Sequence, residues 1–122
     1  MIPLQFQTYI GGYFGPSFDV ELQEDGRLAY SAREGEKEAV SEILSVEHTV
    51  WAEFRSALEY ACVRDWADKY NSPILDGTQW GLEIAYTDWQ KKCHGSNNYP
   101  PSGQFEIFLQ AVRKLTGGRP FE

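Results

Sequence analysis

The chain has little cysteine, histidine and positive charge. Its 122 residues include two Cys, two His and 11 Lys and Arg against 18 Asp and Glu, for a formal net charge of -7. Cys62 and Cys93 are too few and too far apart for a disulfide scaffold, so two separate thiols are expected rather than a bridge. The acidic balance repels nucleic-acid phosphate and anionic lipid, and it favours a basic partner.

Membrane-spanning and targeting patterns are also missing. No run of 18 apolar residues occurs, which argues against a membrane-spanning helix. The N-terminal residues MIPLQFQTYIGG have no basic stretch and alternate too much for a signal peptide, so we expect a cytoplasmic protein. No linker rich in Pro, Gly or Ser divides the sequence, and residues 1–122 are predicted to form a single domain.

No sequence signature of a common reaction is present, whether nucleophile elbow, phosphate-binding loop or dinucleotide fingerprint. His48, His94 and the two cysteines show none of the spacings of zinc sites, so no metal or cofactor is expected. Cys93 and His94 are adjacent, and adjacent side chains of a strand point to opposite faces, which argues against a nucleophile pair. The glycines of residues 11–15 precede a strand rather than a helix, so they predict a turn and not a phosphate site.

Residues 76–116 carry the clearest structural pattern. A half-buried strand is predicted from four apolar residues that alternate with small or polar ones: Trp80, Leu82, Ile84 and Tyr86. A turn at Thr87-Asp88 leads to a second strand over residues 89–94, and its lysines indicate a place nearer the sheet edge. After a loop at residues 95–101, Ser102 is the predicted N-cap of a helix that ends at Gly117-Gly118. The apolar positions of this helix are Phe105, Phe108, Leu109, Val112 and Leu115.

The first half of the chain predicts more strands and one long helix. Strands are expected over residues 2–10, 17–22 and 28–32, with a hairpin turn at Glu24-Asp25-Gly26. Residues 39–44 fit a fourth strand, although their propensities also suit a helix. Ser45 is the predicted cap of a helix with apolar positions Val50, Trp51, Phe54, Leu58 and Ala61. The helix either breaks near Cys62-Val63 or continues to Tyr70, because Trp66 and Tyr70 are four residues apart.

These elements predict an α+β fold, in which an antiparallel sheet of five or six strands has both helices packed on one face. The expected core consists of Trp51, Phe54, Leu58, Trp80, Leu82, Ile84, Phe105, Phe108, Leu109 and Val112.

Three short patterns resemble a small bacterial domain family of uncharacterised function. They are Trp66-x3-Tyr70, Asp76-Gly77-x2-Trp80 and Gly95-Ser96-Asn97-x-Tyr99-Pro100 before an apolar helix. The resemblance covers roughly residues 45–117, with looser similarity at residues 11–17. It implies a shared fold and supplies no catalytic residue.

The candidate binding residues are Asp76, Ser96, Asn97, Asn98 and Tyr99. Ordered loops on rigid scaffolds are where binding residues concentrate. The alternative is structural: Asp76 and Asn97 bond to the backbone of their own turns, and Tyr99 packs under the last helix.

The leading hypothesis for function is a binding or protein-interaction module without catalysis. Its more specific form is an immunity-like protein that neutralises a basic toxin. Small size and acidic charge motivate it, including the acidic residues of residues 47–68. One alternative is a small hydrolase that uses the Ser96–Tyr99 loop with Asp76 or His94. Another is a homo-oligomeric structural domain paired through an edge strand.

Overall fold

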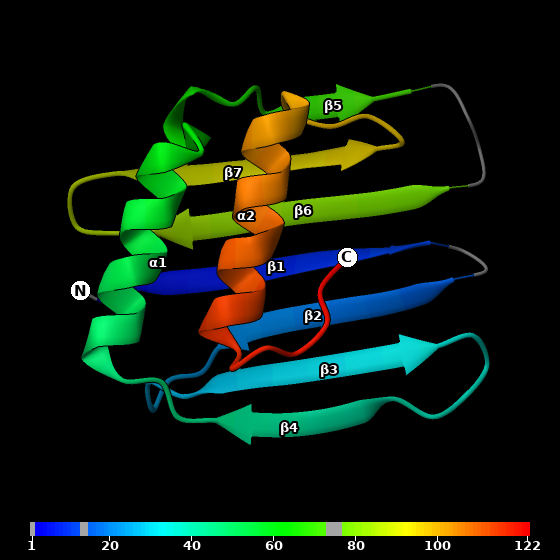
Figure 1. Ribbon diagram of the computed structural model, residues 1–122, viewed down its shortest axis with the longest axis horizontal. Helices are drawn as coiled ribbons and strands as arrows, with labels where there is room; N and C mark the ends of the chain where they lie inside the picture. Colours follow the sequence, from blue (N-terminus) through cyan, green and yellow to red (C-terminus); the bar gives the residue numbers. More distant parts are fainter. Residues whose placement is uncertain (1, 13–14, 73–76) are drawn as a thin grey trace.

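Seven strands form one sheet, and two helices cover one of its faces (Figure 1). The computed structural model describes residues 2–12, 15–72 and 77–122. Within these residues the strands are β1 Gln5–Gly12, β2 Pro16–Leu22, β3 Leu28–Glu34, β4 Val40–Leu44, β5 Lys69–Asn71, β6 Thr78–Ala85 and β7 Gln90–Ser96. The order across the sheet is β4-β3-β2-β1-β6-β7-β5, and every neighbouring pair is antiparallel except β5 and β7. The predicted α+β class is therefore confirmed.

The two helices, α1 His48–Tyr60 and α2 Ser102–Leu115, lie side by side and run in opposite directions across the strands (Figure 1). Their apolar stripes face the sheet, and all ten residues of the predicted core are buried. Aromatic rings make much of the contact between the layers. The ring centroids of Phe6 in β1 and Phe54 are 5.2 Å apart, and those of Trp80 in β6 and Phe105 are 5.0 Å apart. Each such ring contributes about 1.5–3 kcal/mol by leaving water.

The alternation predicted for the strands is present in the sheet. In β6, Trp80, Leu82 and Ile84 are buried under the helices, whereas Gln79 and Glu83 face solvent. The hairpin between β2 and β3 turns at Glu24-Asp25-Gly26, as predicted, and Gly26 takes a φ of 87° that favours glycine. Residues 40–44 form a strand, which decides between the two interpretations of that segment.

The sheet has one or two strands more than the sequence predicted. The short strand β5 begins within the segment after Cys62, over which the sequence left open whether the helix breaks or continues to Tyr70. Helix α1 stops at Tyr60, and Cys62 then adopts a left-handed conformation with φ 57°, which a right-handed helix does not contain. A 3-10 turn over Val63–Asp65 redirects the chain, and Lys69–Asn71 pairs with β7. Three residues are too few to show alternation, so only the pairing identifies the strand.

Neither predicted serine cap is confirmed. Helix α1 begins at His48, three residues after Ser45, because Val46 packs against the core and the chain stays extended at Glu47. The backbone carbonyl of Glu47 accepts the first helical hydrogen bonds without any side-chain cap. In α2 Ser102 is already the first helical residue, and Pro101 occupies the cap position. Proline suits this place because it has no N–H to satisfy.

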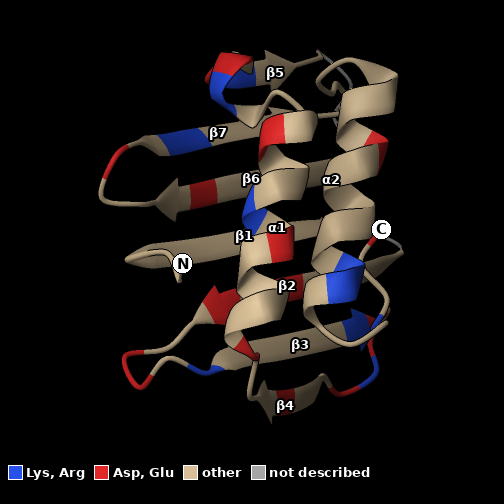
Figure 2. Ribbon diagram, turned by 60° about the vertical axis from the view of Figure 1, so that its left-hand side comes forward, with Lys and Arg blue, Asp and Glu red and all other residues tan. Residues whose placement is uncertain are grey.

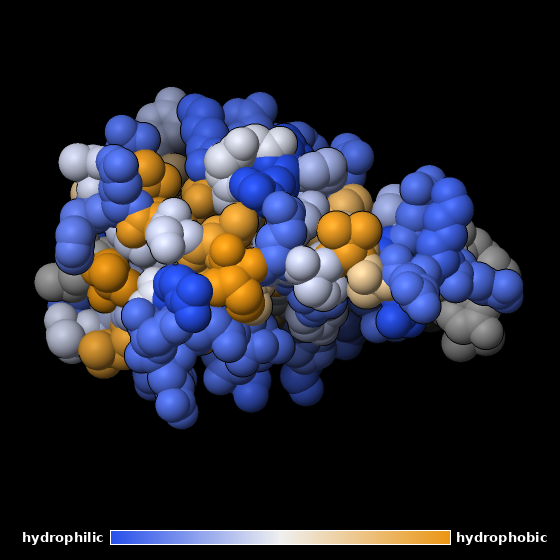
Figure 3. All heavy atoms as spheres, turned by 90° about the horizontal axis from the view of Figure 1, so that it is seen from below, coloured by the Kyte–Doolittle hydropathy of each residue, from blue (hydrophilic) through white to orange (hydrophobic). Residues whose placement is uncertain are grey.

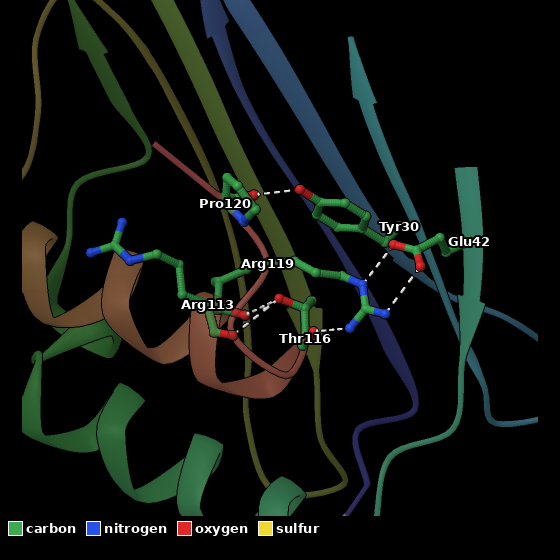
Figure 4. A network of polar contacts seen from close by, with 7 residues as sticks. Tyr30, Glu42, Arg113, Thr116, Arg119 and Pro120 are labelled. Atoms are coloured by element: carbon green, nitrogen blue, oxygen red, sulfur yellow. Dashed lines mark hydrogen bonds and ion pairs between the residues drawn. The ribbon is translucent and has the colours of Figure 1, made fainter. Parts of the chain in front are cut away.

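The segment after α2 folds back over the sheet and connects α2 with β3 and β4 (Figure 4). Gly117 and Gly118 end the helix as predicted, with φ values of 73° and 94°. The hydroxyl of Tyr30 donates to the carbonyl of Pro120 at 2.7 Å. Phe121 is fully buried between the rings of Phe18 and Phe108. Phe121 is therefore part of the core, whereas its neighbours Pro120 and Glu122 are exposed. Among the described residues, no helix is long and apolar enough to cross a membrane.

Candidate functional site

The predicted site segment, Ser96 to Tyr99, follows directly from β7 and folds tightly against β6. Asn97 has a left-handed φ of 54°, and its Oδ1 accepts a hydrogen bond from the backbone N–H of Thr78 at 2.9 Å. The backbone N–H of Asn97 also donates to the carbonyl of Thr78. A Cβ at Gly77 would lie 1.8 Å from Asn97 Oδ1, so glycine is required beside this amide. This geometry matches the structural alternative for Asn97.

The other residues of the segment are divided between backbone contacts and exposed polar groups. The indole N–H of Trp80 donates to the carbonyl of Asn98, and Asn98 Oδ1 accepts from the N–H of Tyr99. The Tyr99 ring lies 5.2 Å from Phe105 of α2 and keeps 39% of its surface exposed. Ser96 is half-buried on the sheet. A binding role for Ser96–Tyr99 stays a prediction.

The residues of the hydrolase alternative do not form a connected catalytic set among the described residues. His94 and Ser96 lie on one face of β7, and neither the imidazole nor the hydroxyl hydrogen-bonds to another described residue. Cys93 points to the opposite, buried side, as predicted, and burial raises the pKa of its thiol to about 11. Cys62 and Cys93 are both free thiols. Asp76 lies outside the described residues. No group of His, Cys, Asp or Glu in the described chain is arranged to hold a metal ion.

A second candidate emerges on the side of the sheet that the helices leave uncovered, which we call the open face. Its central residues come from β2, β1 and β6, and the strand register aligns them in two rows. One row is Glu21, Gln7 and Glu83, and the next is Asp19, Tyr9 and Gly81. No described helix or loop packs over these residues (Figure 1).

Tyr9 lies across Gly81 at the centre of the open face. A Cβ at Gly81 would approach the Tyr9 ring to 2.4 Å, so the glycine leaves room for the ring to lie against the strand. Tyr9 covers Gly81, yet 39% of its own surface remains exposed. Two open hollows of about 270 and 150 Å³ border the ring. Two wider hollows, of about 590 and 400 Å³, lie further along the same face, and Glu83 lines both of them. A row of recesses therefore runs along the face, into which side chains of a partner could fit.

The charges of the open face are separated across the sheet. β2, β1 and β6 carry Asp19, Glu21 and Glu83 and have no Lys or Arg, whereas β7 and β5 carry Lys92 and Lys69 (Figure 2). Partial burial and the neighbouring Glu21 raise the pKa of Asp19 above its ordinary value. The centre of the face is thus acidic, and basic side chains flank it on both sides, because exposed Arg33 of β3 lies opposite Ser17 on the same face.

Several other acidic residues are neutralised within the chain. Arg55 and Arg64 lie within 4.0 Å of both Glu59 and Asp88, and Lys91 lies 3.8 Å from Asp68. By contrast, the three carboxylates of the open face form no ion pair with a described residue. The sequence shows these residues as the polar positions of alternating strands. It does not show that the strands are neighbours.

Comparison with known proteins adds no assignment: no family model matches the chain, and no curated protein matches it either. The resemblance based on residues 45–117 therefore remains a prediction, and the site rests on its geometry.

Proposed function

We propose that this protein is a cytoplasmic protein-interaction module without catalysis that binds a basic protein partner through the acidic centre of its open face. An immunity-like role, in which the chain neutralises a basic toxin, is the specific form of this proposal. The observation that carries it is the arrangement of Asp19, Glu21 and Glu83 around the exposed ring of Tyr9.

Physical chemistry supports a protein as the partner. Tyrosine is enriched at binding hot spots because its rigid ring offers a large contact area and a polar tip. Lys92 lies opposite Glu83 in the sheet, but neither Glu83 nor Asp19 nor Glu21 forms an ion pair with a described residue. Lysine or arginine side chains of a partner therefore meet carboxylates that are not already in an ion pair. Complementary charge also accelerates association, and this acceleration falls with ionic strength.

The test is capture of partners from an extract of the native host at low salt, with the purified chain immobilised. We expect a basic protein to be retained by the wild type and lost by the double variant Glu21→Gln/Glu83→Gln. Tyr9→Ala should weaken capture by about tenfold or more, as expected for a central aromatic contact.

The matched control is Glu47→Gln/Glu53→Gln, which removes the same charge from exposed positions at α1. This variant should retain the partner. Recovery of no protein at low salt would contradict the proposal, as would equal loss of binding in both double variants, since that result would indicate total charge rather than the open face.

A further inference from the structure

The two edges of the sheet differ in how they resist pairing with another strand. The β5 edge has three residues and exposes Lys69, both of which discourage stray pairing. The β4 edge has five residues and contains neither lysine nor proline. Val40 and Ile43 of β4 are 62% and 54% exposed, and apolar residues are spread along this side of the molecule (Figure 3). The β4 edge is therefore the less protected one.

The free backbone groups of β4 follow from the hydrogen-bond alternation of its neighbours. In the β2–β3 hairpin, the N–H of Gln23 donates to the carbonyl of Arg27 at 2.8 Å. Bonded and non-bonded pairs alternate along antiparallel strands, so every second residue of β3 turns its backbone groups towards β4. The hydrogen-bonded pairs between β3 and β4 are therefore Leu28 with Leu44, Tyr30 with Glu42 and Ala32 with Val40. Ser41 and Ile43 consequently direct their N–H and C=O groups away from the sheet.

The one charged side chain of β4 is neutralised by the same molecule. Glu42 accepts two hydrogen bonds from the guanidinium of Arg119, from Nε at 2.6 Å and from Nη2 at 3.1 Å (Figure 4). A charge on an edge strand normally repels an approaching identical strand. Because the Glu42 carboxylate is already paired with Arg119, it repels an identical strand less than a free carboxylate would.

We propose that β4 pairs antiparallel with β4 of a second copy of this chain about a two-fold axis at Glu42, which makes one sheet continuous through two molecules. In this register Ser41 lies opposite the partner's Ile43, so the outward backbone groups of both copies bond to each other. The small Ser41 side chain leaves room for the branched side chain opposite it. On the helix side Val40 lies opposite the partner's Leu44, and the two Glu42 residues meet as internally neutralised pairs.

A second copy fits this edge for three reasons that hold together about a two-fold axis. The outward backbone groups of the two strands bond to each other, a small side chain lies opposite a branched one, and each Glu42 carboxylate is already neutralised by Arg119. This interaction is separate from the open face and does not depend on the proposed basic partner. The two also differ in salt dependence: each copy carries a net charge of -7, so self-association should strengthen as salt screens the repulsion. Binding of a basic partner should weaken instead.

The test is the mass in solution by sedimentation and light scattering over a wide concentration range at low and moderate salt. We expect a species of twice the 13.9 kDa chain mass that accumulates with concentration and with salt. Ser41→Pro removes an outward N–H without removing an internal ladder bond, and Ile43→Lys places a charge at the contact. Each should weaken the dimer by about tenfold or more.

Tyr60→Lys is the matched control, because Tyr60 is 77% exposed at the end of α1, away from β4, and the variant should still dimerise. Unchanged thermal unfolding of the diluted variants verifies their fold. Glu42→Cys in a Cys62→Ser background should also form a disulfide across the axis under mild oxidation, since Cα atoms of a non-hydrogen-bonded pair are about 4.5 Å apart. A monomer at every concentration would overturn the proposal, as would a dimer that is insensitive to Ser41→Pro and Ile43→Lys or one that gives no cross-link.

Discussion

Arg119 and Glu42 are 77 residues apart in the chain and form a two-pronged ion pair, with Nε and Nη2 of the guanidinium at 2.6 and 3.1 Å from the carboxylate oxygens. Arg119 Nη1 also donates to the carbonyl of Thr116 at the end of α2. One arginine thus connects the edge strand β4 with the helix end. This contact lowers the pKa of Glu42, and the arginine hydrogen bond is the main cause.

We therefore expect Glu42→Gln to lower the unfolding temperature at pH 7. Because the folded-state pKa of Glu42 is depressed, its stabilising effect is present above the ordinary carboxyl value of 4.5 and is lost as pH falls through the folded pKa. The unfolding temperatures of wild type and variant should differ at pH 7, approach each other as pH falls below 4.5 and become equal only below the folded-state pKa of Glu42. The exposed Glu36→Gln is the control, and a difference that stays constant down to pH 3 would contradict the assignment.

Gly95 is expected to tolerate no larger residue. A Cβ there would lie 2.5 Å from the carbonyl oxygen of Asn98 and 2.7 Å from that of Tyr70, and backbone atoms cannot swing aside as a side chain does. Gly95→Ala should lower the free energy of unfolding by about 2 kcal/mol or more, measured by urea titration.

Gly103→Ala is the matched control for this substitution. Gly103 lies in the first turn of α2 with no atom within 4 Å of the added Cβ, so alanine should stabilise the protein by up to about 1 kcal/mol. Equal destabilisation by both substitutions would show that the close packing around Gly95 is not the cause.

Asn97 allows its conformation and its hydrogen bond to be tested separately. Asn97→Ala loses the hydrogen bond from the Thr78 N–H, and alanine has no side-chain amide to offset the strain of a left-handed φ of 54°. The substitution should lower the free energy of unfolding by about 2 kcal/mol. Asn97→Gly loses the bond but adopts this φ freely, so it should cost about half as much. If urea unfolding shows glycine to be the worse replacement, the left-handed conformation is not a source of strain.

Phe121 should be a major contributor to stability although it is the penultimate residue. Its ring is fully buried against Phe18 and Phe108, and Phe121→Ala should lower the free energy of unfolding by about 3 kcal/mol. Glu122→Ala, one position further at an exposed residue, should change it by less than about 0.5 kcal/mol. A small effect of Phe121→Ala in urea unfolding would show that the C-terminal segment is not part of the core.

The strong periodic segments were predictable, and the irregular ones were not. Trp80, Leu82 and Ile84 identify a half-buried strand without knowledge of its neighbours, and Phe105, Phe108 and Val112 do the same for α2. The helix ends were harder to predict from the sequence. After α1 the chain turns at Cys62, which has a left-handed φ, and cysteine is not a residue type that indicates such a turn. The serine caps at Ser45 and Ser102 were wrong because serine favours an N-cap without specifying the residue at which the helix starts.

The candidate sites were predictable to different degrees. The segment Ser96–Tyr99 stands out in the sequence as a polar loop between a strand and a proline pair. The open face does not, because Tyr9, Glu21 and Glu83 become neighbours only through pairing between strands that are far apart in the chain.

The sequence by itself determined which side chains are buried in the clearly periodic elements, such as β6 and α2, the acidic charge and the α+β class, because the period of apolar residues is a property of the local chain. Tertiary structure alone decided the seventh strand, the place of Phe121 in the core, the Glu42–Arg119 pair and the side of the sheet left uncovered. Each of these depends on which distant segments meet, and a contact of that kind has no local period from which it can be read.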